Sequence, residues 1–188
     1  MRPMSPSPLM TVQPADVLDF WREAGPTRWF RKDTAFDTLF RTRFLAGHEA
    51  AARGELDSWH ADAAGVLALL LLLDQFPRNA FRDTPRMFQT DPKARDIALR
   101  AFHAGFDRAT DSELRNFFYL PFVHSEALPD QDRAVELARG LGGEALRYAI
   151  IHRDIIEKFG RFPHRNEVLG RTTTPEERKF LEDGGFPG

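Results

Sequence analysis

Three separated stretches of the sequence carry most of the side chains that could bind a ligand or do chemistry. Each stretch places arginine, histidine, carboxylate or amide groups within a few residues of phenylalanine and proline. A guanidinium group is planar and can bind a carboxylate or phosphate through two parallel hydrogen bonds. We therefore expect the ligand to be an anionic small molecule or the acidic end of a peptide. The candidate ligand-binding residues are Asp74, Arg78, Asn79, Arg82, His124, Glu126, His152, Arg161, His164, Arg165, Asn166 and Arg171.

The last of these stretches, residues 147–171, is locally basic. It contains six Lys/Arg and three acidic residues, whereas the whole chain has a formal net charge of −2. We interpret this surplus as a surface that faces an anion. The alternative is that these arginines bind carbonyls and carboxylates within the fold, because charged clusters form ion-pair networks more often than they form sites.

An enzyme is the second hypothesis. Acid–base catalysis would use His124, Glu126 and His152, because histidine titrates near neutral pH. Asp74 is a further carboxylate that could pair with either histidine. A divalent ion is an alternative, with His124, Glu126, His152 and His164 as its possible ligands, but we expect neither a metal nor another cofactor. Ser125 follows His124 directly, yet adjacency in sequence does not place a base beside a nucleophile.

Composition excludes several classes of protein. The absence of cysteine removes thiolate nucleophiles, disulfides and Cys-ligated metal sites, and it agrees with a cytoplasmic location. A pI near 6.3 argues against a dedicated nucleic-acid-binding protein. The longest apolar run, residues 66–73, is too short to cross a bilayer, so we expect no membrane span. The glycine-rich phosphate loop and the HExxH and GxSxG motifs are also missing from the sequence.

Helices must position the candidate residues. Apolar residues recur every three or four positions in segment after segment, which predicts an all-α fold of about eight helices without strands. Short connections predict stacked antiparallel helical hairpins. We expect one helical domain over residues 14–188, preceded by a disordered Pro/Ser-rich tail over residues 1–13. The expected helices cover residues 14–24, 34–52, 59–76, 91–106, 111–118, 129–141, 144–159 and 174–181.

Local signals predict where several helices begin and end. Thr34 and Asp37 have the spacing of a capping box, and Asp91 is expected to cap the helix that follows it. Pro77 is expected to end the most hydrophobic helix. Gly160 is expected to close the helix before the third stretch by taking a left-handed conformation.

Three long motifs together resemble one known family. They are LDQFPRNAFR at 73–82, FFYLPFVHSEALPDQ at 117–131 and HRDIIEKFGRFPHRNEVLGRTTTPEE at 152–177. This combination resembles the bacterial family catalogued as domain of unknown function 924, over about residues 15–186. The resemblance implies an all-helical fold of the tetratricopeptide-repeat-like class and no established activity, although the sequence shows no fixed repeat period. A helical adaptor without a pocket is therefore the third hypothesis, beside the anion-binding protein and the enzyme.

Overall fold

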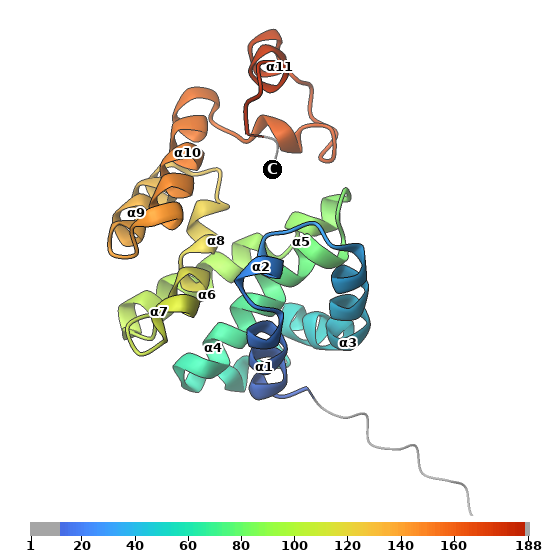
Figure 1. Ribbon diagram of the computed structural model, residues 1–188, viewed down its shortest axis with the longest axis vertical. Coiled ribbons are helices and arrows are strands. Elements are labelled where there is room, and N and C mark those ends of the chain that lie inside the picture. Colours follow the sequence, from blue (N-terminus) through green and yellow to red (C-terminus); the bar gives the residue numbers. More distant parts are fainter. Residues whose placement is uncertain (1–11, 187–188) are drawn as a thin grey trace, which may run out of the picture.

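The computed structural model describes residues 12–186, and within that range it contains helices and no strand. This confirms the predicted all-α fold. Short helices add to the expected long ones where proline starts a turn. The α-helices are α1 (Pro14–Ala24), α2 (Pro26–Trp29), α3 (Thr34–Arg53), α4 (Ala63–Leu70), α5 (Phe76–Ala80), α6 (Asp91–Ala104), α7 (Ser112–Arg115), α8 (Leu120–Val123), α9 (Leu128–Arg139), α10 (Gly143–Phe159) and α11 (Pro175–Glu182), shown in Figure 1.

Helix α4 lies at the centre of the main bundle. Residues 66–73 are apolar, and each is at most 2% exposed, because α1, α3, α5 and α6 surround this part of the chain. Phe20 and Phe40 stack with ring centroids 5.1 Å apart beside this core. Burying one large apolar side chain contributes about 1.5–3 kcal/mol, so this aromatic and leucine-rich core is the main source of stability. Residues 1–11 of the expected tail lie outside the described residues, whereas Val12 packs against the core.

The start of α4 differs from the prediction. Residues 57–61 form a 3₁₀ helix, and Asp62 then caps α4 by accepting the backbone N–H of Gly65 at 2.8 Å. A Cβ atom on Gly65 would collide with the carbonyl oxygen of Trp59. The glycine therefore permits a close approach of two backbone segments, which the apolar pattern of the sequence does not reveal.

Pro77 does not end the helix, so that prediction is wrong. The chain continues from α4 through a π-helical segment, residues 71–75, into α5. Proline has no N–H, and a regular helix would need that group to bond a carbonyl one turn earlier. Other side chains replace it: the His48 ring Nδ1 lies 2.8 Å from the Leu72 oxygen, and the Thr90 hydroxyl donates to the Leu73 oxygen at 2.5 Å. Tertiary contacts thus stabilise a helix that its own sequence would interrupt.

Two predicted helix caps are also wrong. Asp33, rather than Thr34, caps α3, and its carboxylate accepts two backbone N–H groups at 3.0 Å. Asp91 lies inside α6 and makes no cap, because Thr90 is the residue at the N-cap position. The carboxylates of Asp37 and Asp91 bind arginines instead.

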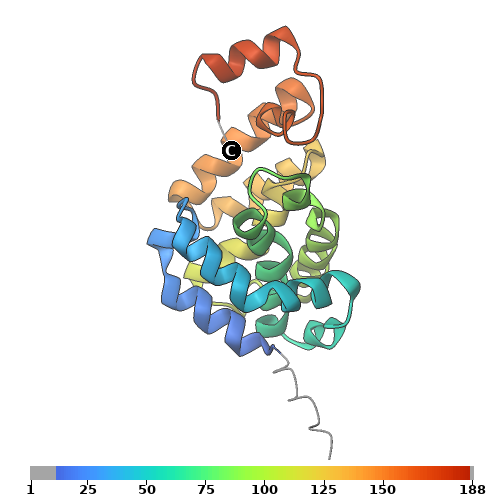
Figure 2. The ribbon, with the colours of Figure 1, turned by 90° about the vertical axis from the view of Figure 1, so that its right-hand side faces the viewer.

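The C-terminal part extends beyond the main bundle (Figures 1 and 2). Helices α9 and α10 form an antiparallel hairpin with a short connection. Gly160 then ends α10 with φ +69°, as predicted. A second, smaller apolar cluster forms around Ile155, Ile156 and Phe162. Ile150, expected on the apolar side of this helix, is 41% exposed. None of the helices described over residues 12–186 has the length and apolar character needed to cross a membrane.

Candidate functional site

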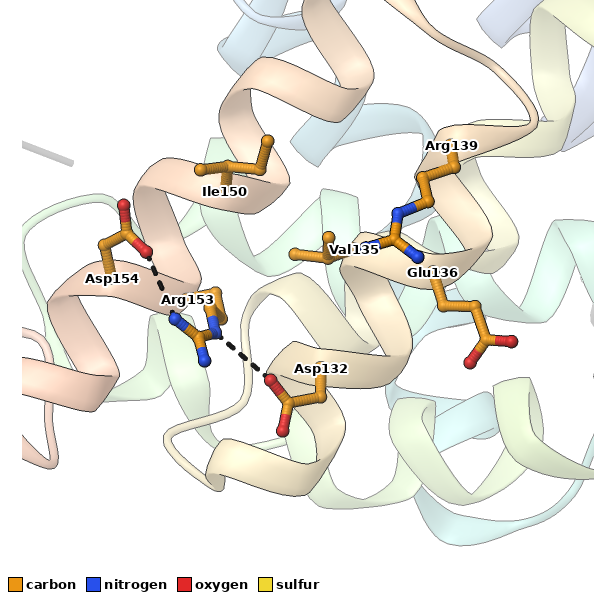
Figure 3. A pocket seen from close by; sticks show the side chains of 7 residues that line it. All are labelled: Asp132, Val135, Glu136, Arg139, Ile150, Arg153 and Asp154. Carbon is orange, nitrogen blue, oxygen red and sulfur yellow. Dashed lines mark hydrogen bonds and ion pairs between the residues drawn. The ribbon is translucent and has the colours of Figure 1, made fainter.

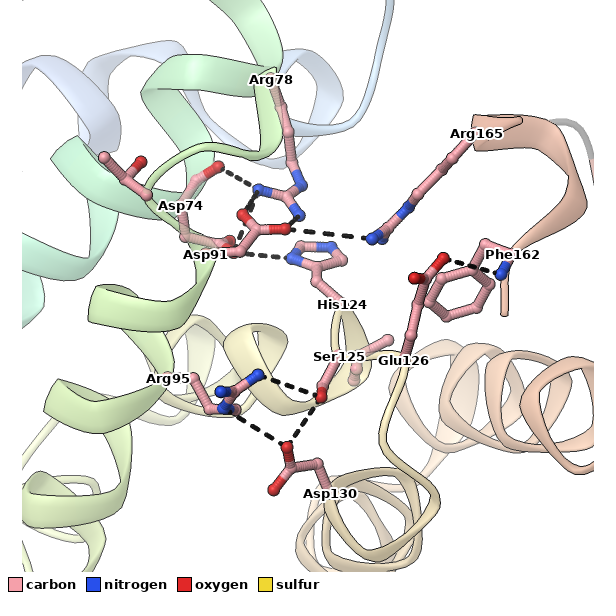
Figure 4. A network of polar contacts seen from close by, with 12 residues as sticks. Asp74, Arg78, Asp91, Arg95, His124, Ser125, Glu126, Asp130, Phe162 and Arg165 are labelled. Carbon is pink, nitrogen blue, oxygen red and sulfur yellow. Dashed lines mark hydrogen bonds and ion pairs between the residues drawn. The ribbon is translucent and has the colours of Figure 1, made fainter. Parts of the chain in front are cut away.

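One charged or titratable residue from each of the three motifs reaches the junction between the main bundle and the C-terminal segment (Figure 4). Asp74 belongs to the π-helical segment, His124 follows α8, and Arg165 lies in a 3₁₀ turn after α10. The fold therefore brings together residues that are far apart in sequence. We call Asp74, Arg78, Asp91, His124 and Arg165 the junction cluster.

Asp74 is the anchor of the junction cluster and is 1% exposed. Its carboxylate accepts hydrogen bonds from Gln75 Nε2 at 2.6 Å and from His124 Nδ1 at 2.7 Å, and it lies 3.2 Å from Arg78 Nη1. Burial by itself raises the pKa of Asp74. The charge of Arg78 and the hydrogen bonds outweigh burial and hold that pKa at about 2. Arg78 is in turn fixed by two parallel hydrogen bonds to Asp91, at 2.8 and 2.9 Å.

His124 has a defined tautomer because its neighbour is an ionised carboxylate. Nδ1 lies 2.7 Å from Asp74 Oδ1, so Nδ1 carries the hydrogen and Nε2 carries the lone pair. Burial, and then the charge of Arg78, lower the pKa of His124, which keeps the ring neutral near pH 7. Within residues 12–186, Nε2 has no hydrogen-bond partner from the protein. The side chain is 15% exposed, so it lies at the edge of the cluster that reaches solvent.

Arg165 is a buried cation without a hydrogen-bonded acidic partner among the described residues, although the charges of Asp91, Glu126 and Asp74 favour its charged form. The residue is 7% exposed, and its guanidinium lies between the rings of Phe88 and Phe162, 4.6 and 4.4 Å from their centroids. The carboxylate that pairs with it is Asp91, with an oxygen 4.0 Å from Nη1. Its Nε is buried and has no hydrogen-bond partner. Burial, and next the charge of Arg78, lower the pKa of Arg165 to about 10.

Two other candidates from the first motif serve the fold. Arg82 binds Asp37 on α3 through Nε at 2.6 Å, and Asn79 donates to the same carboxylate at 2.7 Å. These contacts tie α5 to α3. They agree with the ion-pair alternative that we kept open for the arginines.

The candidates in the third motif are divided between structural contacts and the junction. Arg161 binds the buried carboxylate of Glu177 at 2.6 and 2.9 Å, and Asn166 donates to that carboxylate at 3.0 Å. Arg171 binds Glu126 through two hydrogen bonds of 2.8 Å. Glu126 also accepts the backbone N–H of Phe162 at 2.9 Å, so it joins the C-terminal segment to the loop after α8.

His152 and His164 lie near Arg165, on either side of Phe162. His152 Nδ1 is 2.8 Å from the Tyr148 oxygen, and burial lowers the pKa of His152 to about 3. Burial, followed by the charge of Arg165, lowers the pKa of His164 to about 4. The Nδ1 atom of His164 is buried without a partner. Both rings are therefore neutral near pH 7. His152 donates from Nδ1 to the Tyr148 oxygen, so its Nε2 can only accept a hydrogen bond, whereas His164 Nδ1 can donate or accept one.

Two other chemistries have no geometric support. The Ser125 hydroxyl donates to Asp130 at 2.7 Å, next to the start of α9, so it is not paired with the His124 ring (Figure 4). In the part of the chain that the structure describes, no three His, Asp or Glu side chains are grouped so that they could hold a metal ion.

Two surface hollows in the described part of the molecule lie away from the junction cluster. One of about 400 Å³ is formed between α9 and α10, where Arg153 bridges Asp132 at 3.1 Å and Asp154 at 3.5 Å (Figure 3). A second of about 470 Å³ lies between α7 and the α9–α10 connection. Their lining residues are of mixed charge, and none of them belongs to the set predicted from the sequence.

Sequence reasoning missed two contributors to the junction cluster. Asp91 has the Asp-Pro signature of a helix cap, and no sequence signal links it to Arg78. Phe88 covers one face of Arg165 from a 3₁₀ turn over Pro85–Phe88, and no sequence signal links the two residues. Both contacts depend on how α5, α6 and the C-terminal segment pack together.

Comparisons with known proteins establish the family. The family model described as "Bacterial protein of unknown function (DUF924)" matches residues 17–185. The solved structure of a protein of unknown function from Agrobacterium tumefaciens is similar, with a TM-score of 0.90 and 57% sequence identity over 91% of this chain and 97% of that one. Comparison with curated proteins gave no match. The resemblance carried by the three motifs is confirmed, and the chain belongs to this family of bacterial proteins, DUF924.

Proposed function

We propose that this protein binds a small anion, through a carboxylate or phosphate group, at Arg165 beside His124 and His164. The observation that supports this most is the state of Arg165. Its guanidinium is buried between two phenylalanine rings, its acidic partner Asp91 is 4.0 Å away, and its Nε has no hydrogen-bond partner. A buried cation is costly unless an anion or hydrogen bonds compensate it. A ligand anion would supply both.

The neighbouring groups suit such a ligand. The neutral rings of His124 and His164 each have a nitrogen without a protein partner. His124 Nε2 can accept a hydrogen bond from a ligand, and His164 Nδ1 can donate or accept one. The side chains of Arg78, Asp91 and His124 are 13%, 15% and 15% exposed, so solvent reaches the edge of the cluster. Arg78 adds a second positive charge beside the site, although its guanidinium is already paired with Asp74 and Asp91.

Calorimetric titration with phosphate, with a short carboxylate and with a peptide bearing a free C-terminus would test this proposal. We expect at least one of them to bind, and Arg165→Met to weaken that binding by about tenfold or more, since charged hydrogen bonds contribute about 1.5–3 kcal/mol. The matched control is Arg153→Met, which removes an arginine from the α9–α10 hollow and should leave binding unchanged. A peptide with an amidated C-terminus lacks the terminal carboxylate, so the difference in affinity between the two peptides reports recognition of that carboxylate. Equal binding by Arg165→Met and the wild type would refute the proposal.

The adaptor hypothesis receives less support. The large exposed apolar residues, Phe30, Leu39, Leu128, Tyr148 and Ile150, come from separate parts of the described chain. Single exposed apolar residues are ordinary on protein surfaces, so they do not favour an adaptor. The cytoplasmic location stays a prediction.

A further inference from the structure

We propose that the anion site is catalytic and that His124 Nε2 is a general base, which removes a proton from the bound anion. This inference rests on the proposed anion binding at Arg165. The substrate class is a small carboxylate or phosphate with a hydrogen on a carbon next to a carbonyl group. Asp74 is the positioning residue, because it touches the imidazole and not the ligand.

The geometry of the Asp74–His124 pair is the first argument. An effective general base needs a fixed ring, a defined tautomer and a free lone pair. The 2.7 Å contact to Asp74 fixes the ring and puts the hydrogen on Nδ1. The lone pair of Nε2 then points away from Asp74, on the side of the cluster where Arg165 lies (Figure 4). A carboxylate in that position also stabilises the imidazolium that forms when the base accepts a proton.

The rigidity of Asp74 is the second argument. Gln75 and Arg78 fix its carboxylate, and Arg78 is itself held by Asp91. The residue lies in a π-helical segment, and such segments occur frequently at functional sites. A buried carboxylate hydrogen-bonded to a neutral imidazole contributes little to the stability of a fold, since the desolvation of the carboxylate offsets most of the attraction. The contacts of Asp74 are better explained if their role is to hold the His124 ring in one orientation and tautomer.

The protonation state of His124 is the third argument. Burial and the nearby charge of Arg78 lower its pKa, so the base is unprotonated near neutral pH and ready to accept. The charged groups with the largest effect on the ring are Arg78, Asp74 and Asp91, and the neutral rings of His152 and His164 also lie near it. Arg165 supplies the positive charge that holds the substrate anion.

The proposed step needs no further reactant. The C–H bond next to the carbonyl breaks, its electron pair stays on the substrate as an enolate, and the proton forms a new N–H bond with His124 Nε2. The imidazolium then returns a proton to the same carbon, which gives exchange of that hydrogen with solvent. In D₂O the returned particle is a deuteron once the ring has exchanged with solvent.

Deuterium incorporation from D₂O, followed by proton NMR, would test the step with pyruvate as the carboxylate probe and dihydroxyacetone phosphate as the phosphate probe. We expect the wild type to exchange at least one probe faster than free imidazole at equal concentration. His124→Gln should lower that rate by about 10²-fold or more, which is the contribution typical of a general base. The exposed His103 provides the matched control, and His103→Gln should keep the wild-type rate.

The outcomes separate this inference from the binding proposal. Binding measured by calorimetry with no exchange above free imidazole would refute the catalytic role and leave anion binding standing. Absence of binding would refute both. A wild-type rate in His124→Gln would also overturn the inference. The comparison of exchange rates between the wild type and free imidazole tests the inference even if a variant fails to fold. Arg165→Lys should raise KM more than it lowers kcat, because Arg165 holds the anion and does not take the proton.

Discussion

Replacing Arg165 by methionine should stabilise the protein in a buffer without phosphate or carboxylates. Burial, and next the charge of Arg78, lower the pKa of Arg165 well below its ordinary value, to about 10. At about 1.4 kcal/mol for each pH unit, this difference amounts to about 3 kcal/mol against the charged form. Methionine removes that cost and fills the same space between Phe88 and Phe162.

The opposing term is the loss of two cation–π contacts, at 4.6 and 4.4 Å, each of which contributes about 0.5–2 kcal/mol. Sulfur–aromatic contacts of methionine recover about 0.3–1.5 kcal/mol each. We therefore expect Arg165→Met to raise the free energy of unfolding by about 1–2 kcal/mol, because the energy gained by removing the buried charge exceeds the energy lost with the cation–π contacts. For a chain of 188 residues, this corresponds to a rise in Tm of about 2–8 °C.

The assay is urea unfolding followed by far-UV circular dichroism, with Arg161→Met as the matched control. That substitution leaves the buried carboxylate of Glu177 without its main partner, so it should lower the free energy of unfolding by about 1–3 kcal/mol. Phosphate at ten times its Kd should stabilise the wild type by about 1.4 kcal/mol and Arg165→Met by much less. A loss of stability in Arg165→Met as large as that in Arg161→Met would refute the reasoning, because it would make Arg165 a structural contact.

Three further predictions concern the scaffold of the site. The pKa of His152 is about 3 in the folded chain and near 6.5 in the unfolded one, so the free energy of unfolding falls as pH drops below 6.5. Urea unfolding of His152→Gln at each pH should show a loss between pH 7 and pH 5 that is about 2 kcal/mol smaller than in the wild type. Gly65→Ala should lower the free energy of unfolding by about 1–3 kcal/mol, because the added Cβ would collide with the Trp59 carbonyl oxygen, although alanine favours a helix more than glycine does. An increase in stability would contradict the close approach of these two backbone segments. His48→Ala should cost about 1–3 kcal/mol, read from the shift in Tm, because the Leu72 oxygen loses its donor; an unchanged Tm would show that the helix does not need it.

Much of the fold could be predicted from the sequence, because helix patterns are local. The apolar repeat predicted α1 to the residue, and Gly160 ended α10 as its conformational freedom suggested. The failures occurred where distant groups decide the structure. Pro77 remains inside a helix because side chains from α3 and from just before α6 bond the carbonyls that it leaves free.

The candidate site was predictable as a set of residues but not as a geometry. The chemistry of arginine and histidine directed attention to the three motifs. Which arginines are neutralised depends on carboxylates far away in sequence, such as Asp37 for Arg82 and Glu177 for Arg161. The exception, Arg165, could be recognised only after the packing around it was known. The same holds for the pairing of His124 with Asp74, which the sequence leaves as one of several combinations.

The most direct test of anion binding is the arginine Nε–H region of a ¹H–¹⁵N spectrum recorded during titration with phosphate. The Arg165 Nε is buried without a partner, so its signal should shift downfield as the anion binds, in proportion to occupancy. The Nε signals of Arg161 and Arg82, whose Nε atoms already donate to Glu177 and Asp37, should hardly move. An Arg165 signal that stays in place through the titration, or moves no more than those two, would contradict the account.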